Sequence, residues 1–296
     1  DRHQNTVIAN YYHQDFLVPG YTGLLSFHYN NDQPGTKFDR NRFLVRPDPA
    51  GVFQPHRVEA YYLGLAGQGH FGHLNVSNAF YYVWGRDGLN PIAGQEQDIE
   101  AQMSAIELSY DRDWARFRVS WFWASGDPDP NDGDAEGFDA IFDNPNFAGG
   151  EFSYWQRQAI RLFGVGLTQR QSLVANLRSS KTQGQSNFVN PGLSLVNAGI
   201  DMDVTPRLKL VANANFLWFD DTKSLEVFTF QDKIDSQIGT DLSLGIEYRP
   251  YLNDNVQIIS GLSSFIPARG FKDLYTPFNG KVETLFGHFL EVILTY

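Results

Sequence analysis

The chain has 296 residues, and its 34 acidic side chains outnumber 23 basic ones, which gives a formal net charge of −11. This acidic balance argues against a nucleic-acid partner, because binding to phosphates requires a basic surface. The chain has no cysteine, which excludes disulfides, thiolate zinc sites and thiol nucleophiles. It also has no apolar run of about eighteen residues, the length of a transmembrane helix.

Aromatic residues make up 15% of the chain, although its mean hydropathy is −0.35. This combination is typical of a membrane β-barrel, in which lipid-facing and lumen-facing residues alternate along each strand. The alternation predicts eleven antiparallel strands separated by turn residues. We expect them at residues 6–15, 21–31, 57–66, 71–85, 98–110, 114–125, 193–203, 208–219, 239–249, 256–265 and 282–296, with Gly-Gln-Gly as the turn between the third and the fourth.

Short and long connections alternate along these strands. The long ones are residues 32–56, 86–97, 126–190, 220–236 and 266–281. Outer-membrane barrels have short periplasmic turns and long outer loops, so the sequence predicts an all-β, antiparallel transmembrane barrel in the bacterial outer membrane, in contact with lipid. The alternative is a large soluble β-sandwich, in which the aromatic residues would form the core.

The strand count and its direction predict how the chain is organised. Eleven strands are an odd number, whereas complete bacterial barrels have an even number with both ends on the periplasmic side. We therefore expect residues 1–296 to be a single barrel domain that forms the carboxy-terminal part of a larger barrel. Residues 126–190 form a long outer or inward-folded region that is too long for a plain loop, so we expect it either to add a strand pair or to fold into the lumen.

The local charge reverses in part of this long connection. Residues 152–200 contain no Asp or Glu, but they carry Arg157, Arg161, Arg170, Arg178 and Lys181. A cationic segment in an acidic protein indicates an anionic solute at a pore constriction. The alternative is that acids elsewhere in the chain pair with these five cations.

Polar side chains on predicted strands are further candidates for a solute path. Arg116 and Arg118 share the polar face of one strand, and Glu107 faces them from the strand before. Asn213 and Asn215 extend the polar face two strands further on. Fixed guanidinium groups suit carboxylates or phosphates, but Arg116 and Arg118 could equally form an ion-pair ladder that stiffens the wall.

An acidic run follows the sixth predicted strand. Asp127, Asp129, Asp132 and Asp134 resemble the oxygen-rich start of a calcium loop, although the EF-hand spacing is not met. We expect either a calcium site, the one cofactor that the sequence suggests, or a solvated acidic loop.

Several segments resemble the alginate-export family of outer-membrane porins. They are ASGDPDP (124–130), GFD (137–139), GVGLTQRQSLVANLRSSK (164–181), GQSNFVNPG (184–192) and IGTDLSLGIEYRP (238–250). The resemblance covers most of residues 120–296. It implies a barrel of about eighteen strands whose arginine-lined lumen passes an anionic polysaccharide.

The sequence therefore predicts an outer-membrane channel for anionic or polar solutes, such as saccharides, without catalytic residues. Its histidines have no metal-binding spacing of the HExxH kind, and no Gly-x-Ser-x-Gly elbow occurs. Two alternatives remain open. One is a barrel that encloses or anchors a partner chain, such as an electron carrier, and the other is a barrel-embedded hydrolase.

Overall fold

The structure, a computed structural model, describes residues 3–38, 42, 44–47, 51–52, 54–141, 147–157, 184–253 and 255–295. Long antiparallel strands dominate these residues and form one sheet. They are β1 (Gln4–His13), β2 (Tyr21–Asp32), β5 (Val58–Phe71), β6 (Leu74–Asp87), β7 (Gln97–Arg112), β8 (Ala115–Ala124), β10 (Leu193–Thr205), β11 (Leu208–Trp218), β12 (Gln237–Tyr248), β13 (Val256–Pro267) and β14 (Leu285–Leu294).

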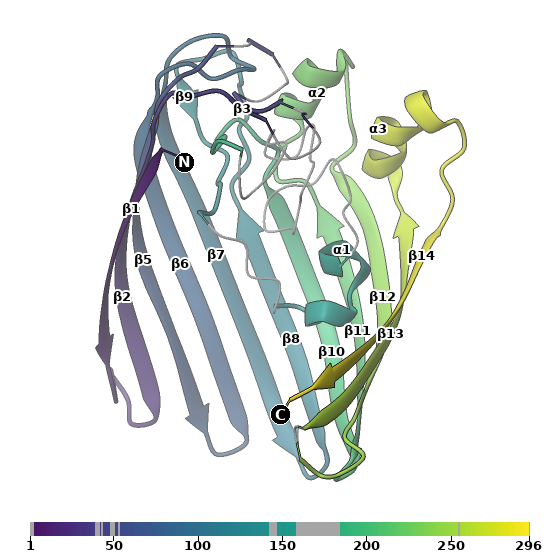
Figure 1. The fold of residues 1–296 in the computed structure, drawn as a ribbon. Helices are drawn as coiled ribbons and strands as arrows, with labels where there is room; N and C mark the ends of the chain where they lie inside the picture. Colours follow the sequence, from purple (N-terminus) through teal and green to yellow (C-terminus); the bar gives the residue numbers. More distant parts are fainter. Residues whose placement is uncertain are drawn as a thin grey trace.

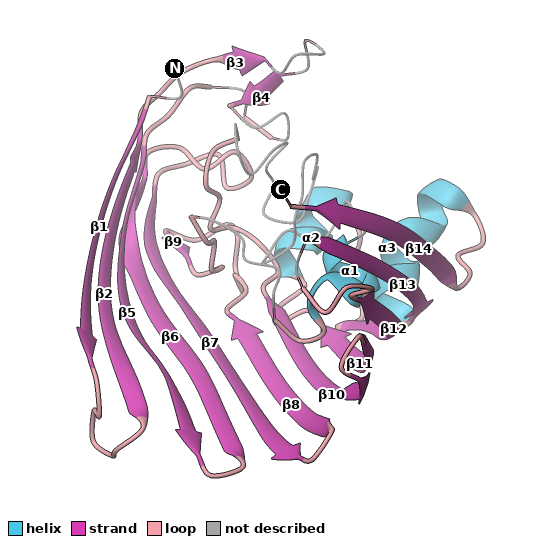
Figure 2. Ribbon diagram, turned by 60° about the horizontal axis from the view of Figure 1, so that its bottom comes forward, coloured by secondary structure: helices cyan, strands magenta, loops and turns pink. Residues whose placement is uncertain are grey.

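The order of these strands in the sheet follows their order in the chain. The sheet curves into a wall with one concave and one convex face (Figures 1 and 2). Within the described residues, β1 and β14 lie at its two ends and do not pair with each other, so the wall is not closed. All eleven strands that the alternation predicts are present, which confirms the all-β antiparallel fold.

Smaller elements lie in the long connections. A hairpin of β3 (Lys37–Phe38) and β4 (Leu44–Arg46) follows β2, and β9 (Asp134–Ala135) pairs in parallel with β7. The helices are η1 (Gly150–Phe152), α1 (Tyr154–Arg157), α2 (Lys223–Thr229) and α3 (Arg269–Asn279). In the described part of the chain, no helix has both the length and the apolarity needed to cross a membrane.

Short turns join the strands at the lower end of the wall in Figure 1, and the long connections gather at the upper end. We call these the short-turn end and the long-loop end. One predicted turn is wrong, because Gly-Gln-Gly (67–69) lies inside β5 and the chain reverses at Gly72 and His73. Gly72 has a left-handed φ of 64°, as a tight hairpin requires. Gly67 instead pairs with Asn78 and leaves room for the ring of Tyr21.

The convex face of the wall is apolar and exposed. Phe117, Val119 and Trp121 of β8 are exposed on this face, and the ten residues of β8 span about 30 Å along the strand, which is about 23 Å across a layer when the strand is tilted by about 40°. That height matches the apolar band of about 25 Å on outer-membrane barrels. A β-sandwich would bury this face. In this protein, the exposed side chains of the convex face include Leu25, Leu63, Leu108, Val119, Trp121, Phe216, Leu244 and Leu262.

The hydrophobic core lies on the concave side, towards the long-loop end. Val83, Ala101 and Leu195 of the wall pack in one buried cluster with Phe138 and Phe188 of the connections. The connections therefore fill the upper part of the concave side. The lower part of the concave side, towards the short-turn end, carries polar side chains.

Candidate functional site

One row of side chains on the concave face is polar in eight neighbouring strands. Paired residues of antiparallel strands face the same side of a sheet, so the strand register aligns these side chains across the wall. We call this row the polar belt. Its members, from β2 to β12, are Thr22, Gln68, Ser77, Glu107, Ser120, Asn197, Asn215 and Asp241.

Hydrogen bonds link the centre of the polar belt. The hydroxyl of Ser120 donates to Oε2 of Glu107 over 2.7 Å, and the Nδ2 group of Asn197 donates to Oδ1 of Asn215 over 2.8 Å. Ser120, Asn197 and Asn215 are buried. These bonds satisfy polar groups that the wall would otherwise bury unpaired, and they hold the row in place.

Arg118 lies next to the belt, on the side of the short-turn end. Its Nη2 group donates to Oδ1 of Asp201 and to Oδ1 of Asn213, each over 2.8 Å, and its Nη1 group is 3.9 Å from Oε2 of Glu107. The guanidinium is therefore held by a carboxylate and an amide. This arrangement favours the ion-pair ladder over a guanidinium that is available to a solute.

Arg116 is paired in the same way. Its Nη2 group donates to Oδ2 of Asp111 over 2.9 Å, and Asn75 donates to the same oxygen over 3.0 Å. Lys209 extends the ladder, because its Nζ atom lies 3.7 Å from Asp201 and 3.8 Å from Glu247. Both candidate arginines thus belong to a network of wall residues.

A segment of the long connection folds onto the concave face. The ring of Phe152, in η1, packs with Val211 and Ile259 in a small buried cluster. A Cβ atom at Gly245 of β12 would overlap this ring, so the glycine provides the socket in which it lies. Glycine inside a strand often marks such a close approach, and this signal was available in the sequence.

Asp241 anchors the same segment. Its Oδ2 atom accepts the backbone N–H of Trp155 over 3.0 Å, and both side chains are buried. α1 contacts β12 and β13 from the concave side (Figure 1). The segment therefore covers the β11–β12 end of the polar belt, where Asn213 and Asn215 are buried.

The other predicted cations cannot be placed. Arg157 ends α1, but its side chain is not among the described ones. Arg161, Arg170, Arg178 and Lys181 lie outside the described residues. Their contact with an anionic solute stays a prediction, as do the number of strands in the whole barrel and the full course of residues 126–190.

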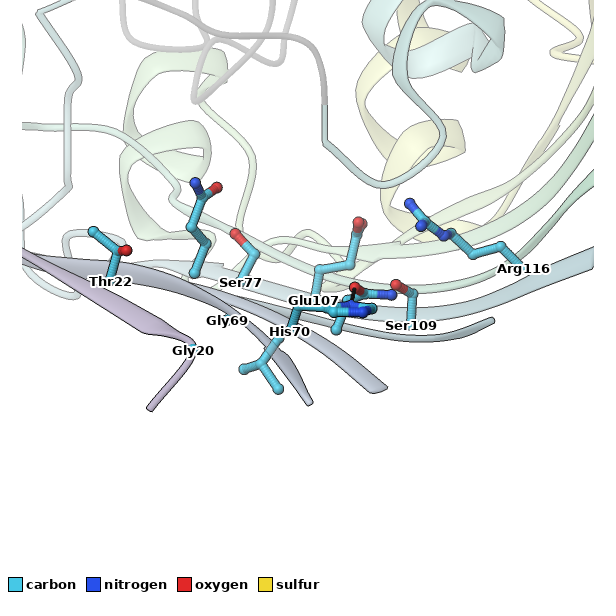
Figure 3. A pocket seen from close by; sticks show the side chains of 11 residues that line it. Gly20, Thr22, Gly69, His70, Ser77, Glu107, Ser109 and Arg116 are labelled. Carbon is cyan, nitrogen blue, oxygen red and sulfur yellow. Dashed lines mark hydrogen bonds between the residues drawn. The ribbon is translucent and has the colours of Figure 1, made fainter. Parts of the chain in front are cut away.

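The opposite end of the polar belt lines a cavity of about 390 Å³ between β2 and β8 (Figure 3). In this view, the side chains of Thr22, Ser77 and Glu107 point away from the wall into the concave space. Gln68 and Ser109 also line the cavity. The cavity thus presents hydroxyl and amide groups beside the carboxylate of Glu107 and the guanidinium of Arg116.

In the described part of the chain, no three His, Asp or Glu side chains converge in a way that could hold an ion, and this includes the four aspartates of the acidic run. Oδ1 of Asp127 accepts the N–H of Asp129 over 3.1 Å, and Oδ1 of Asp132 accepts the N–H of Asp134 over 2.8 Å. These contacts are Asx turns that shape the loop. The calcium site stays a prediction.

The buried carboxyl of Asp127 predicts a pH-dependent stability. Burial raises its pKa to about 8, the N–H of Asp129 opposes this shift, and Asp132 and Glu136 add to it. An unfolded Asp ionises near pH 4, so from about pH 4 to pH 8 the folded protein holds a proton that the unfolded chain has lost. Stability should therefore fall as the pH rises through this window.

We expect Asp127→Asn to remove this slope and to stabilise the protein at pH 7, by an amount on the order of a few kcal/mol. Denaturant unfolding in detergent between pH 4.5 and 8.5 measures the effect. Asp129→Asn is the matched control, because Asp129 is exposed. Parallel pH profiles for the wild type and Asp127→Asn would contradict the assignment.

A buried network at the long-loop end was not predicted. The Nη2 group of Arg46 lies 2.6 Å from Oδ1 of Asp32, and both side chains are almost fully buried. Asn90 donates to Asp87 over 3.1 Å and to Asn187 over 2.9 Å. We call these five residues the buried clamp. It ties residues 184–192 to β2 and β6. No local motif reveals it, because Arg46 lies 14 residues beyond Asp32 and Asn187 lies 97 residues beyond Asn90.

No family model matches the chain, and no curated protein matches it. Among solved structures, it is similar to the copper transporter OprC, with a TM-score of 0.44 and 10% identity over 91% of this chain, which spans 38% of OprC. For OccK11 (OpdR) of Pseudomonas aeruginosa the TM-score is 0.40, with 13% identity over 90% of this chain and 73% of that one. For outer membrane phospholipase A of Escherichia coli the TM-score is 0.34, with 9% identity over 99% of this chain and 77% of that one.

Similarity at this level says nothing about what the chain binds, and none of these three is an alginate-export protein. The strands themselves decide the class of the protein. They form an antiparallel wall whose convex face is apolar over about the thickness of the hydrocarbon layer. Its concave face carries the polar belt, and short turns occur at one end only.

The fold is that of an outer-membrane β-barrel wall. Antiparallel strands that span a bilayer in this way are found in the bacterial outer membrane, and the chain is located there.

Proposed function

We propose that the protein is an outer-membrane channel for small polar solutes, including saccharides. One observation carries the proposal: the polar belt is covered at its β11–β12 end by residues 147–157 and lines a cavity of about 390 Å³ at its other end. A narrowed polar lumen beside an inward-folded segment is what selective diffusion requires.

The mechanism is exchange of hydrogen bonds along the wall. Ser77, Ser109 and Gln68 can replace part of the hydration shell of a hydroxyl-rich solute, so that it enters without a large desolvation cost. Binding must stay weak at each position for the solute to leave again. No covalent step is needed.

The proposal includes transport of anionic solutes. These solutes would contact Arg157, Arg161, Arg170, Arg178 and Lys181 rather than Arg116 and Arg118. Arg116 is already paired with Asp111, and Arg118 is already paired with Asp201. The resemblance of residues 120–296 to alginate-export porins supports an anionic polysaccharide as one such solute.

Planar-bilayer conductance of the complete protein tests the proposal. We expect open-channel current, and we expect Ser77→Trp to lower it about two-fold or more, because an indole would occupy much of the cavity beside the belt. Leu108→Trp is the control, since Leu108 is exposed on the convex face. Absence of current in the wild type would overturn the channel and favour a barrel that encloses a partner chain.

A further inference from the structure

The polar belt consists of two parts that differ in their hydrogen bonding. From β7 to β12, its members bond to one another or to residues 147–157. In contrast, the side chains of Thr22, Gln68 and Ser77, and of Ser109 beside the belt, form no hydrogen bond with any described residue. All four line the cavity of about 390 Å³. Their hydroxyl and amide groups therefore remain available to a solute.

The two charged side chains of the cavity already have partners in the wall. The Nη2 group of Arg116 donates to Oδ2 of Asp111 over 2.9 Å. Oε2 of Glu107 accepts the hydroxyl of Ser120 over 2.7 Å and lies 3.9 Å from Nη1 of Arg118. The charges of Arg116 and Glu107 also cancel in sum. The cavity thus offers a charged solute no excess charge of either sign.

His70 is the remaining titratable group of the lining. Its Nδ1 atom lies 2.5 Å from Oδ1 of Asn75, while Nδ2 of Asn75 donates to Asp111 over 3.0 Å. The amide oxygen of Asn75 can only accept, so Nδ1 of His70 carries the proton and Nε2 of the neutral imidazole is an acceptor. The neutral ring adds an acceptor to the lining without adding a charge.

These groups determine which solute fits. A hydroxyl group both donates and accepts hydrogen bonds, as the hydroxyl and amide side chains of the cavity do, whereas a carboxylate only accepts and an ammonium group only donates. A charged solute would also lose hydration without gaining a free counter-charge. Thr22, Gln68 and Ser77 pair in register on neighbouring strands, about 4.8 Å apart. A solute with several hydroxyl groups can therefore contact them in succession.

We propose that this cavity binds neutral saccharides in preference to charged ones, through the side chains of Thr22, Gln68, Ser77 and Ser109. The inference rests on the proposed channel and names the solute class that is selected at this height of the lumen. It is compatible with the cationic stretch elsewhere in the chain, because a pore can hold charged and uncharged positions at different heights.

Three pyranose sugars test the proposal: neutral glucose, anionic glucuronate and cationic glucosamine. Saturation-transfer NMR on the complete detergent-solubilised protein at pH 7 measures binding of each. We expect glucose to bind at least about fivefold more tightly than either charged sugar, a difference equivalent to one hydrogen bond. In bilayers, we expect glucose to block the current most strongly.

Two variants test the groups that the proposal names. Gln68→Leu removes a donor and an acceptor at nearly constant size, so it should weaken glucose binding about fivefold or more. Gln102→Leu is the matched control, because Gln102 lines a different cavity. Asp111→Asn takes the carboxylate away from Arg116 and should raise the binding of glucuronate relative to glucose.

The outcomes separate the solute class from the channel. Equal or tighter binding of glucuronate or glucosamine by the wild type would overturn the proposal, as would glucose binding that Gln68→Leu leaves unchanged. Current without sugar binding would overturn the proposal and leave the channel in place. Preferential binding of glucose without current would support the cavity and overturn the channel.

Discussion

Replacement of Gly245 by leucine is expected to displace the inward-folded segment and to raise the single-channel conductance at least about two-fold. A side chain at this position would occupy the space of the Phe152 ring, and protein interiors close to crystal density have no room for both. Once the ring leaves its socket, residues 147–157 lose their packing on the wall. The β11–β12 end of the polar belt then becomes accessible, and bilayer recordings measure the wider path.

Two further variants keep this prediction testable. Phe152→Ala removes the ring without adding a side chain to β12. It should also raise the conductance, because loss of a buried aromatic costs about 3–5 kcal/mol of packing. Leu244→Ala is the control, since the neighbouring Leu244 is exposed on the convex face. Unchanged conductance in both Gly245→Leu and Phe152→Ala would show that the segment does not narrow the lumen.

Arg46→Met is expected to destabilise the protein by about 3–5 kcal/mol, because it leaves the carboxylate of Asp32 buried without its cation. The guanidinium also approaches the carbonyl oxygen of Gly184 at 3.5 Å, so the substitution loosens residues 184–192 as well. Denaturant unfolding in detergent measures the loss. Limited proteolysis should show earlier cleavage near residue 184.

The double variant Asp32→Leu with Arg46→Met separates charge from packing. Two apolar side chains in place of a buried ion pair are often tolerated, so we expect the double variant to recover most of the lost stability. Arg57→Met is the comparison, because Arg57 forms a more exposed ion pair with Glu59. Its expected loss of stability is below about 1 kcal/mol. A loss below about 1 kcal/mol for Arg46→Met would contradict the role of the buried clamp.

The strands were predictable because their alternation is a local signal. Val119 and Ser120 are adjacent, and a period of two places one on the lipid side and the other in the polar belt without any knowledge of the neighbouring strands. Turn positions were less certain. Gly-Gln-Gly could reverse the chain or could leave room for the ring of Tyr21, and only the packing distinguishes these uses of glycine.

In the candidate site, the sequence likewise predicts which way a side chain faces, but not which partner it meets. That Arg116 and Arg118 face inward with Glu107 follows from the sequence, and the structure agrees. Whether they are free for a solute depends on Asp111 and Asp201, and Asp201 lies 83 residues beyond Arg118 in the chain. An ion pair between distant strands has no local pattern, so the sequence left both readings open.

The sequence by itself determined the all-β class, the eleven strands and the division of side chains between lipid and lumen, because each depends on a repeat of two residues within one strand. Tertiary structure alone decided that Phe152 enters the Gly245 socket, that Asp32 and Arg46 form a buried pair, and that Asp201 and Asn213 hold the guanidinium of Arg118. These contacts join segments far apart in the chain. Their energies come from burial and charge neutralisation, which exist only once the wall has formed.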